Sequence, residues 1–278
     1  MSDSPIKKTY LLDKRRVRRN FDCAAQRYDQ YAVLQREISQ RLVERFDYIK
    51  IDPRQILDIG CGTGGLSVQL LKKFGHAQLV GMDFSLQMAK MFRHKIPWRR
   101  KLRKNVYTVC ADAEELVFPA QRFDLVVSNL TLQWCNDVDR VFAEVKRVLR
   151  PGGLFMFTTF GPDSLKELRD CWSRVDKATH VSAFYDMHDL GDALARNGFA
   201  DPVMDVEHVV MTYPDLKKLV TDLRMIGASN ATQGRRRGLT AKSAWRQLEA
   251  CYEVYRRQGL LPASYEVVFG HAWCSPPG

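Results

Sequence analysis

The chain has 278 residues, 45% of them hydrophobic and 27% charged, with 17 glycines and 11 prolines. This ordinary globular composition excludes collagen, coiled coil and disorder, and the length suffices for one large α/β domain without a disulfide or metal to stabilise it. Lysine and arginine outnumber aspartate and glutamate by 43 to 32, so an acidic partner is favoured, although composition alone does not choose among nucleic acid, anionic membrane and acidic protein.

The N-terminal residues show no targeting pattern, and no stretch is apolar for the length that a membrane span requires. The segment up to Phe21 lacks the apolar region of a secretory signal, and Asp3 and Asp13 argue against a mitochondrial presequence. The seven cysteines include no C-x-x-C pair, which is typical of reduced thiols, and the histidines show no metal-ligand spacing. We therefore expect a cytoplasmic protein without a metal.

The order of the predicted elements indicates an α/β domain. Two helices, Val17–Tyr28 and Val33–Phe46, come first, and strand-like and helix-like stretches then alternate, which is typical of a parallel sheet covered by helices. The expected strands are Gln55–Ile59, Leu79–Asp83, Val106–Cys110, Phe123–Asn129 and Leu154–Phe160, followed later by Val203–Thr212 and Tyr265–Ala272. The main helices among them are expected at Gly65–Phe74, Val138–Leu149, Asp163–Val175 and Met187–Asn197.

We expect four parts along the chain. Residues 1–50 form the N-terminal helices, residues 51–212 the core, residues 213–262 an inserted helical cap around a Gly/Arg-rich turn, and residues 263–278 the last strand and the tail.

The strongest motif is a glycine-rich loop directly after the first expected strand, Asp58-Ile59-Gly60-Cys61-Gly62-Thr63-Gly64. Glycines there permit a tight turn with positive φ and let a ligand approach the backbone. The loop lacks the Gly-Lys-Ser/Thr ending of a P-loop, and its glycine spacing differs from the dinucleotide fingerprint. Asp58 at its mouth disfavours a pyrophosphate and suits a cationic ligand.

This loop and three later positions resemble the motifs of the class I, Rossmann-like S-adenosylmethionine (SAM) methyltransferases. Asp83 ends the second strand, where that family binds the ribose hydroxyls, Asp112 and Ala113 follow the third strand, where it brackets the adenine, and Asn129 ends the fourth, near the methionine end. The resemblance implies a seven-stranded, mostly parallel Rossmann-like sheet and SAM as the cofactor. The cofactor-binding residues that it implies are Asp58, Gly60, Gly62, Gly64, Asp83, Asp112, Ala113 and Asn129.

Further motifs are similar to one family in particular, the malonyl-[acyl-carrier protein] O-methyltransferases of biotin synthesis. These motifs are Phe21-Asp22-x-Ala24-Ala25-x-x-Tyr28-Asp29-x-Tyr31-Ala32-x-x-Gln35, Ser128-Asn129-Leu130-x-Leu132-Gln133-Trp134, Thr158-Thr159-Phe160-Gly161-Pro162 and Leu223-Arg224-x-Ile226-Gly227-Ala228-x-Asn230. The resemblance implies methylation of the free malonyl carboxylate on acyl carrier protein. A carboxylate is already ionised at neutral pH, so this reaction requires alignment of the reactants but no general base.

Four residues are candidates for positioning the acceptor. Arg224 is the expected partner of the malonyl carboxylate, because its motif belongs to the cap that should close over the site, and Tyr28 donates to that carboxylate or covers the methionine end of SAM. Gln133 and Trp134 are expected to wall the pocket beside the methyl group. Their alternative interpretations are a solvated Arg224, packing roles for Tyr28 and Trp134, and a helix cap for Gln133.

The basic run Arg235, Arg236 and Arg237 in the cap is the candidate docking site for the acidic carrier protein. No aromatic platform or RNA module accompanies the charge, so no nucleic acid partner is expected. Two other functions remain open, namely methyl transfer to another small-molecule or RNA acceptor, and SAM binding by an assembly factor of a respiratory complex.

Overall fold

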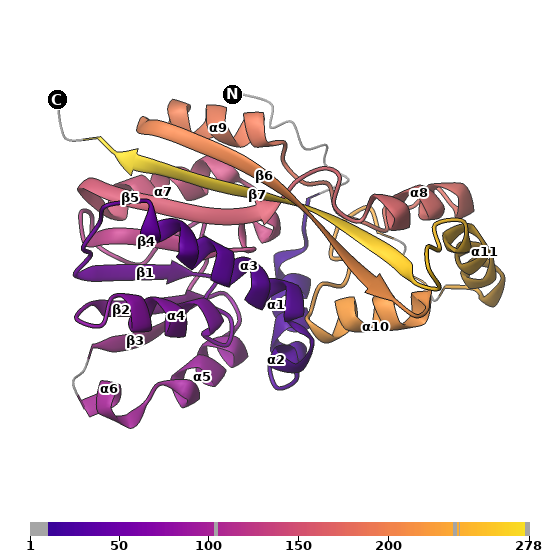
Figure 1. Cartoon of the computed structure of the whole chain (residues 1–278), viewed down its shortest axis with the longest axis horizontal. Helices are drawn as coiled ribbons and strands as arrows, with labels where there is room; N and C mark the ends of the chain where they lie inside the picture. Colours follow the sequence, from indigo (N-terminus) through magenta and orange to yellow (C-terminus); the bar gives the residue numbers. More distant parts are fainter. Residues whose placement is uncertain (1–10, 103–104, 236–237, 239, 276–278) are drawn as a thin grey trace.

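A computed structural model describes residues 11–102, 105–235, 238 and 240–275, and within them seven strands form one sheet in the order β3-β2-β1-β4-β5-β7-β6 (Figure 1). Strands β1 to β5 pair in parallel, and β7 runs antiparallel to both of its neighbours. The strands are β1 Gln55–Ile59, β2 Gln78–Asp83, β3 Val106–Cys110, β4 Phe123–Asn129, β5 Leu149–Phe160, β6 Phe199–Tyr213 and β7 Leu261–Cys274. The predicted seven-stranded, mostly parallel sheet is confirmed.

Helices cover both faces of this sheet. The α-helices are α1 Lys14–Ala24, α2 Tyr28–Tyr31, α3 Val33–Glu44, α4 Gly65–Lys73, α5 Leu86–Lys95, α6 Trp98–Leu102, α7 Val138–Val148, α8 Lys166–Val175, α9 Met187–Arg196, α10 Leu216–Met225 and α11 Lys242–Glu253. Two short 3-10 turns, η2 Arg45–Asp47 and η3 Leu132–Trp134, follow α3 and β4. Neighbouring strand residues point to opposite faces, so Ile56 packs with α3 and α4 whereas Leu57 packs with α7 and α9.

Several predicted boundaries differ from the structure, most of all those of the first helix and of strand β5. The first helix begins at Lys14 and ends at Ala24, because Asp13 caps its start by accepting a hydrogen bond from the Arg16 N–H at 3.2 Å, and Tyr28 then begins a separate short helix. Strand β5 begins five residues earlier than predicted, at Leu149, because Leu149 pairs with Phe123 of β4 before the bulge in that ladder.

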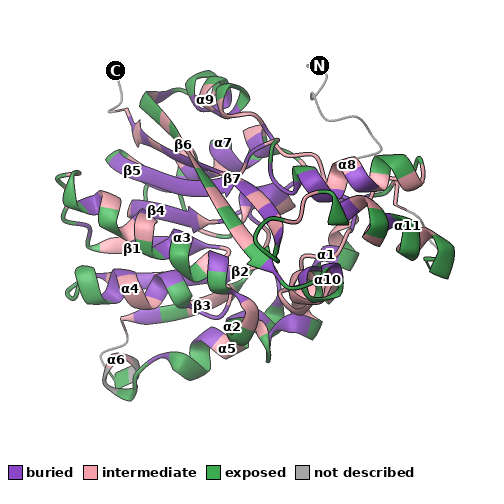
Figure 2. Cartoon of the chain, turned by 45° about the vertical axis from the view of Figure 1, so that its right-hand side comes forward, coloured by how far each residue is buried: buried purple, intermediate pink, exposed green. Residues whose placement is uncertain are grey.

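The last two strands are long enough to extend beyond the sheet core. Figure 1 shows β6 and β7 reaching the side of the molecule where α8, α10 and α11 gather, and Figure 2 shows exposed residues along these outer helices. Helices α10 and α11 lie in the chain between β6 and β7, within residues 213–262. No helix in the described ranges has the length and apolarity to cross a membrane.

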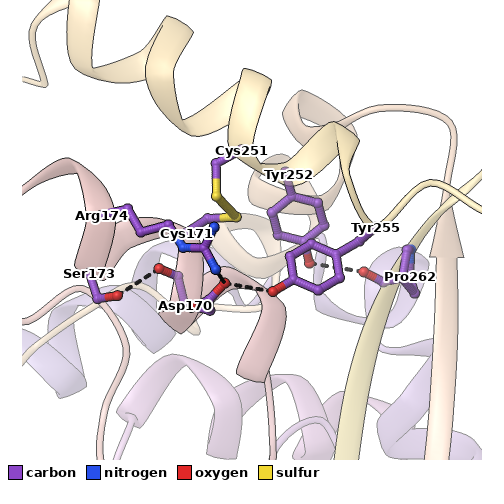
Figure 3. The surroundings of a disulfide bond; sticks show 8 residues. All are labelled: Asp170, Cys171, Ser173, Arg174, Cys251, Tyr252, Tyr255 and Pro262. Atoms are coloured by element: carbon purple, nitrogen blue, oxygen red, sulfur yellow. Dashed lines mark hydrogen bonds and ion pairs between the residues drawn. A yellow bond between two sulfur atoms is a disulfide. The ribbon is translucent and has the colours of Figure 1, made fainter.

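A disulfide joins Cys171 of α8 to Cys251 of α11, with their Cα atoms 5.5 Å apart (Figure 3). Beside it the Tyr255 hydroxyl donates to Asp170 Oδ2 at 2.6 Å, and the Arg174 guanidinium pairs with the same carboxylate at 2.8 Å. The expectation of uniformly reduced thiols is therefore wrong for these two cysteines. Their separation of 80 residues gave the sequence no local sign of the pairing.

Reduction of this disulfide is expected to lower the free energy of unfolding by about 2–4 kcal/mol, because a cross-link over a long loop restricts the unfolded chain. Thermal unfolding with and without a thiol reductant measures the effect. The double variant C171S/C251S is the control and should unfold at the temperature of the reduced protein, with no further shift on adding reductant. An unchanged midpoint for the wild-type protein in reductant would contradict the expectation.

Candidate active site

The glycine loop follows β1 at the carboxyl edge of the parallel strands, where ligands bind in open α/β sheets. Gly60, Gly62 and Gly64 have φ values of +72°, +54° and +89°, a region that suits glycine. A Cβ atom on Gly60 would lie 2.0 Å from Thr131 Oγ1, and one on Gly64 would lie 2.0 Å from the Phe92 ring. Backbone geometry therefore favours glycine at all three positions, and space also requires it at Gly60 and Gly64.

Two buried carboxyl groups lie at this loop. Asp83 Oδ2 accepts a hydrogen bond from the Gly62 N–H at 2.8 Å, and its Oδ1 accepts one from the Ser85 N–H at 2.7 Å. Burial raises the pKa of Asp83 to about 6. Asp58 is 1% exposed, and burial raises its pKa to about 7, partly offset by a 2.5 Å hydrogen bond from Ser67 Oγ.

A first cavity, here called the loop cavity, opens above these groups. Its lining includes six of the predicted cofactor residues: Gly60, Gly62, Asp83, Asp112, Ala113 and Asn129. Asp58 and Gly64 lie outside that lining, and the Oδ1 atom of Asp58 has no hydrogen-bond partner within the described part of the chain. A buried carboxyl group with one unpartnered oxygen next to the cavity favours a cationic ligand, so the site fits the sulfonium and ammonium groups of SAM.

A second cavity, here called the cap cavity, lies between the N-terminal helices, the carboxyl ends of the core strands and the cap. Its apolar lining includes Leu34, Phe160, Leu165 and Phe184, and its polar lining includes Tyr31, Gln35, Ser229 and Asn230. The loop cavity and the cap cavity share Phe21, Tyr28, Leu130 and Trp134. These four residues form the wall between the two cavities. Groups bound in the two cavities would therefore approach each other at this wall.

Tyr28 is held in this wall by its neighbour in α2. Asp29 Oδ1 accepts a hydrogen bond from Thr63 Oγ1 in the glycine loop at 2.5 Å, and Asp29 also forms an ion pair with Lys95 of α5. Burial raises the pKa of the Tyr28 phenol, and the carboxylates of Asp83 and Asp29 raise it further. The phenol is therefore protonated at neutral pH and acts as a hydrogen-bond donor.

The other side of the wall comes from the turn after β4. Gln133 is buried in the cap-cavity lining, where its Nε2 donates to the Leu130 carbonyl at 2.7 Å and its Oε1 accepts from Thr159 Oγ1 at 3.1 Å. Trp134 packs edge-on against Phe21 with ring centroids 5.2 Å apart. Leu130 has a φ of +50°, rare for a residue with a side chain, and this conformation places it in the wall of both cavities.

Arg224 lies apart from the other three acceptor candidates. It is exposed near the end of α10 and lines neither the loop cavity nor the cap cavity. Arg235 donates to the Thr232 carbonyl at 3.0 Å and lies 3.9 Å from Asp13. Arg236 and Arg237 fall outside the described residues.

Several lining residues were not among the predicted site residues. Tyr31 and Gln35 line the cap cavity, Tyr31 from the end of α2 and Gln35 from the first turn of α3, and both belong to the same N-terminal sequence motif as Tyr28. Lys14 lines the loop cavity and pairs with Asp112 at 3.0 Å and Glu114 at 2.8 Å. These partners are about one hundred residues from Lys14 in the chain, and no local pattern indicates the contact.

The sheet order, the glycine loop and the two adjoining cavities define a class I SAM-dependent methyltransferase. Residues 57–157 match the family model described as a methyltransferase domain. Among solved structures, phosphoethanolamine N-methyltransferase 2 of Haemonchus contortus, in complex with S-adenosyl-L-methionine, has a similar fold, with a TM-score of 0.51 and 21% identity over 86% of this chain and 52% of that chain.

Whole-chain similarity narrows the class to one family. A malonyl-[acyl-carrier protein] O-methyltransferase of Methylovorus sp. is 48% identical over 95% of this chain and 90% of its own length. One of Gallionella capsiferriformans is 47% identical over 96% of this chain and 93% of its own length. The chain belongs to the malonyl-[acyl-carrier protein] O-methyltransferase family.

Proposed function

We propose that this chain transfers the methyl group of SAM to the free carboxylate of a malonyl group carried on acyl carrier protein, as an early step of biotin synthesis. The observation that carries the proposal is the shared wall of Phe21, Tyr28, Leu130 and Trp134 between the loop cavity and the cap cavity. The names of the relatives support the same acceptor, and they favour this activity over a role as an assembly factor.

In the loop cavity, the carboxylate of Asp83 accepts hydrogen bonds from the two ribose hydroxyls of SAM. Asp112 and Ala113 bracket the adenine, and Asn129 lies at the methionine end, where its Oδ1 and Nδ2 are already fixed by Thr158 Oγ1 at 2.8 Å and the Gln35 carbonyl at 3.1 Å. Asp58 is partly ionised at neutral pH, because its pKa is about 7, and it acts on SAM through the field of that buried charge.

SAM supplies an electrophilic sulfonium methyl. A bond forms between this methyl carbon and a malonyl carboxylate oxygen while the carbon–sulfur bond breaks, the electron pair stays on sulfur, and no proton moves. Because opposite charges disappear in this step, an apolar cavity favours it over water. No lysine or arginine occurs among the described residues that line the cap cavity, and the carboxylate in that lining, Asp222, is paired with Lys218, so neutral donors hold the nucleophile without quenching it.

Tyr28 is the central positioning residue in this account. Its phenol stays protonated at neutral pH, so it donates a hydrogen bond at the boundary of the two cavities and does not act as a base. Gln133 and Trp134 shape the wall, with Gln133 fixed by its bonds to Leu130 and Thr159. Arg224 lies outside the cap cavity, so the proposal gives it no contact with the malonyl carboxylate.

The proposed partner is acyl carrier protein, an acidic protein that the formal charge of +11 would attract. Arg235, Arg236 and Arg237 are the proposed docking residues, and residues 213–262 are the proposed cap. Residues 1–50 cover the site, and residues 51–212 with 263–278 form the core. Although the Cys171–Cys251 disulfide is unusual for that compartment, we place the enzyme in the cytoplasm, with the fatty-acid elongation enzymes that would accept the ester.

SAM affinity is expected to fall about tenfold between pH 7.5 and pH 5. The pKa of Asp83 is about 6, so its carboxyl is mostly ionised at the higher pH and mostly protonated at the lower, where it no longer accepts two hydrogen bonds. Calorimetric titration of the folded protein with SAM at both pH values measures this change. Asp83→Asn should bind weakly and keep only the part of the pH dependence that comes from Asp58, whose pKa is about 7, and equal wild-type affinities at the two values would contradict the role of Asp83.

The turnover number at saturating SAM and malonyl-acyl carrier protein is expected to be independent of pH between about 6.5 and 8.5. The acceptor carboxylate has an ordinary pKa near 4 and is ionised throughout that range. An acceptor amine or phenol would instead give a rate that rises up to tenfold per pH unit. Such a rise, measured with product release shown not to limit the rate, would overturn the proposed nucleophile.

A further inference from the structure

A third hollow, here called the outer groove, adjoins the cap cavity on its solvent side. The two share six lining residues: Leu168, His180, Leu223, Ala228, Ser229 and Asn230. The outer groove is more open and is also lined by Arg16, Trp172, Arg224 and Trp245. Since the cap cavity lies against the loop cavity, the three hollows form a series from solvent to the glycine loop.

The floor of the outer groove is apolar and held in place by covalent and aromatic contacts. Trp172 of α8 stacks on His180 with ring centroids 3.6 Å apart. The Nε2 atom of His180 is hydrogen-bonded to Asp176 Oδ1 at 2.8 Å. Trp245 of α11 donates from Nε1 to Glu249 at 2.6 Å. The disulfide between α8 and α11 ties the helices that carry these two tryptophans (Figure 3).

The rim of the groove carries unneutralised positive charge. Arg16 of α1 and Arg224 of α10 are both exposed, and neither guanidinium forms a hydrogen bond or an ion pair with any residue that the structure describes. Most other arginines near the site are already paired, as Arg235 is with Thr232. Two free arginines at the mouth of an apolar passage are suited to a ligand with an anionic head and a long, weakly polar body.

We propose that the outer groove binds the phosphopantetheine arm of the acyl carrier protein. Arg16 and Arg224 bind its phosphodiester, the floor of Trp172 and Trp245 packs along the pantetheine chain, and the chain passes Leu168 and Leu223 so that the malonyl group enters the cap cavity. This inference rests on the proposed function and extends it. It also replaces the expected contact of Arg224 with the malonyl carboxylate by a contact with the phosphate.

Charge and shape together favour this occupant. A protein surface alone would not need a groove continuous with the cap cavity, and a free malonate ion would not need arginines outside that cavity. The carrier arm has both parts, because its anionic phosphate and its reactive carboxylate lie at opposite ends of one flexible chain. Coenzyme A has the same arm, and the carrier protein is the proposed source because the charge of +11 adds attraction to its acidic surface.

The test compares the binding of malonyl-phosphopantetheine and malonyl-pantetheine to the whole enzyme by calorimetry, with S-adenosylhomocysteine present. Wild type is expected to bind the phosphorylated compound about 10- to 100-fold more tightly, the effect of charge-assisted bonds to one phosphate. The double variant R16A/R224A should lose this preference while keeping its affinity for SAM. Arg122→Ala is the matched control. Arg122 is exposed just before β4, at the amino ends of the parallel strands and thus away from the glycine loop and the three hollows.

Each outcome of the test decides a separate point. Equal binding of the two compounds by wild type, or an unchanged preference in R16A/R224A, would overturn the groove assignment even if the enzyme methylates malonyl-acyl carrier protein. A phosphate preference that R16A/R224A abolishes, in an enzyme that transfers no methyl to the malonyl group, would retain the groove and overturn the proposed function. Tighter binding of malonyl-coenzyme A than of malonyl-acyl carrier protein would overturn the carrier protein as the source of the arm.

Discussion

Replacing Asp83 by alanine is expected to abolish SAM binding at ordinary ligand concentrations. Its carboxylate lies at the end of β2 in the lining of the loop cavity, where it is the proposed acceptor for both ribose hydroxyls. Each charge-assisted hydrogen bond contributes about 1.5–3 kcal/mol, so the loss of two corresponds to an affinity about 100- to 10,000-fold weaker. The change also leaves the Gly62 and Ser85 N–H groups without their acceptor, which adds to the loss.

Calorimetric titration with SAM measures this loss, and thermal unfolding shows whether the variant remains folded. Asp189→Ala is the control, because Asp189 is exposed on α9 and lines none of the three hollows. It should bind SAM as wild type does. If folded Asp83→Ala binds SAM within a factor of two of wild type, the assignment of the loop cavity is wrong.

Replacing Gly64 by alanine is expected to destabilise the fold by about 2–5 kcal/mol. At a φ of +89° a side chain adds strain, and the new Cβ would lie 2.0 Å from Cδ2 of Phe92. Phe92 is 0% exposed and packs in the core beneath the loop, so its ring has little room to move. The loop must therefore shift, and SAM affinity should fall together with stability.

Gly65→Ala gives a matched control one residue further on. Gly65 begins α4, and a Cβ atom there meets nothing within 4 Å. This variant should retain the stability of wild type or gain slightly, since alanine favours a helix over glycine. Chemical denaturation of both variants provides the comparison, and a Gly64→Ala protein as stable as Gly65→Ala would show that the loop does not need its glycine.

The sequence allowed the parallel core and the cofactor side of the site to be predicted because their signals are local. Each of β1, β3 and β4 is a short apolar run, and the structure has all three at their predicted bounds. The cofactor motifs follow strand ends, and parallel strands bring their carboxyl ends to one edge. Asp83, Asp112 and Asn129 are therefore gathered in one lining by the topology of the sheet alone.

The residues around the cap cavity, where the acceptor is proposed to bind, were harder to predict. That part of the site is formed by contacts between segments that are distant in the sequence. Arg224 belongs to a cap motif, but the direction of its side chain depends on how α10 packs, and the structure places it on the outer groove. The Cys171–Cys251 disulfide joins helices separated by strand β6 and most of the cap. Tyr28 belongs to a motif directly before the core, and the structure places it in the wall between the two cavities, next to the Asp29–Thr63 hydrogen bond to the glycine loop.

The most direct test of the proposed function is transfer of labelled methyl from SAM to malonyl-acyl carrier protein, with acetyl-acyl carrier protein as the control that lacks a free carboxylate. The two acceptors differ only at the reacting group, so docking and arm binding are matched between them. We expect label on the malonyl form alone, released by mild base as a methyl ester is. Label on both forms, or on neither while SAM binding is intact, would contradict methylation of the malonyl carboxylate.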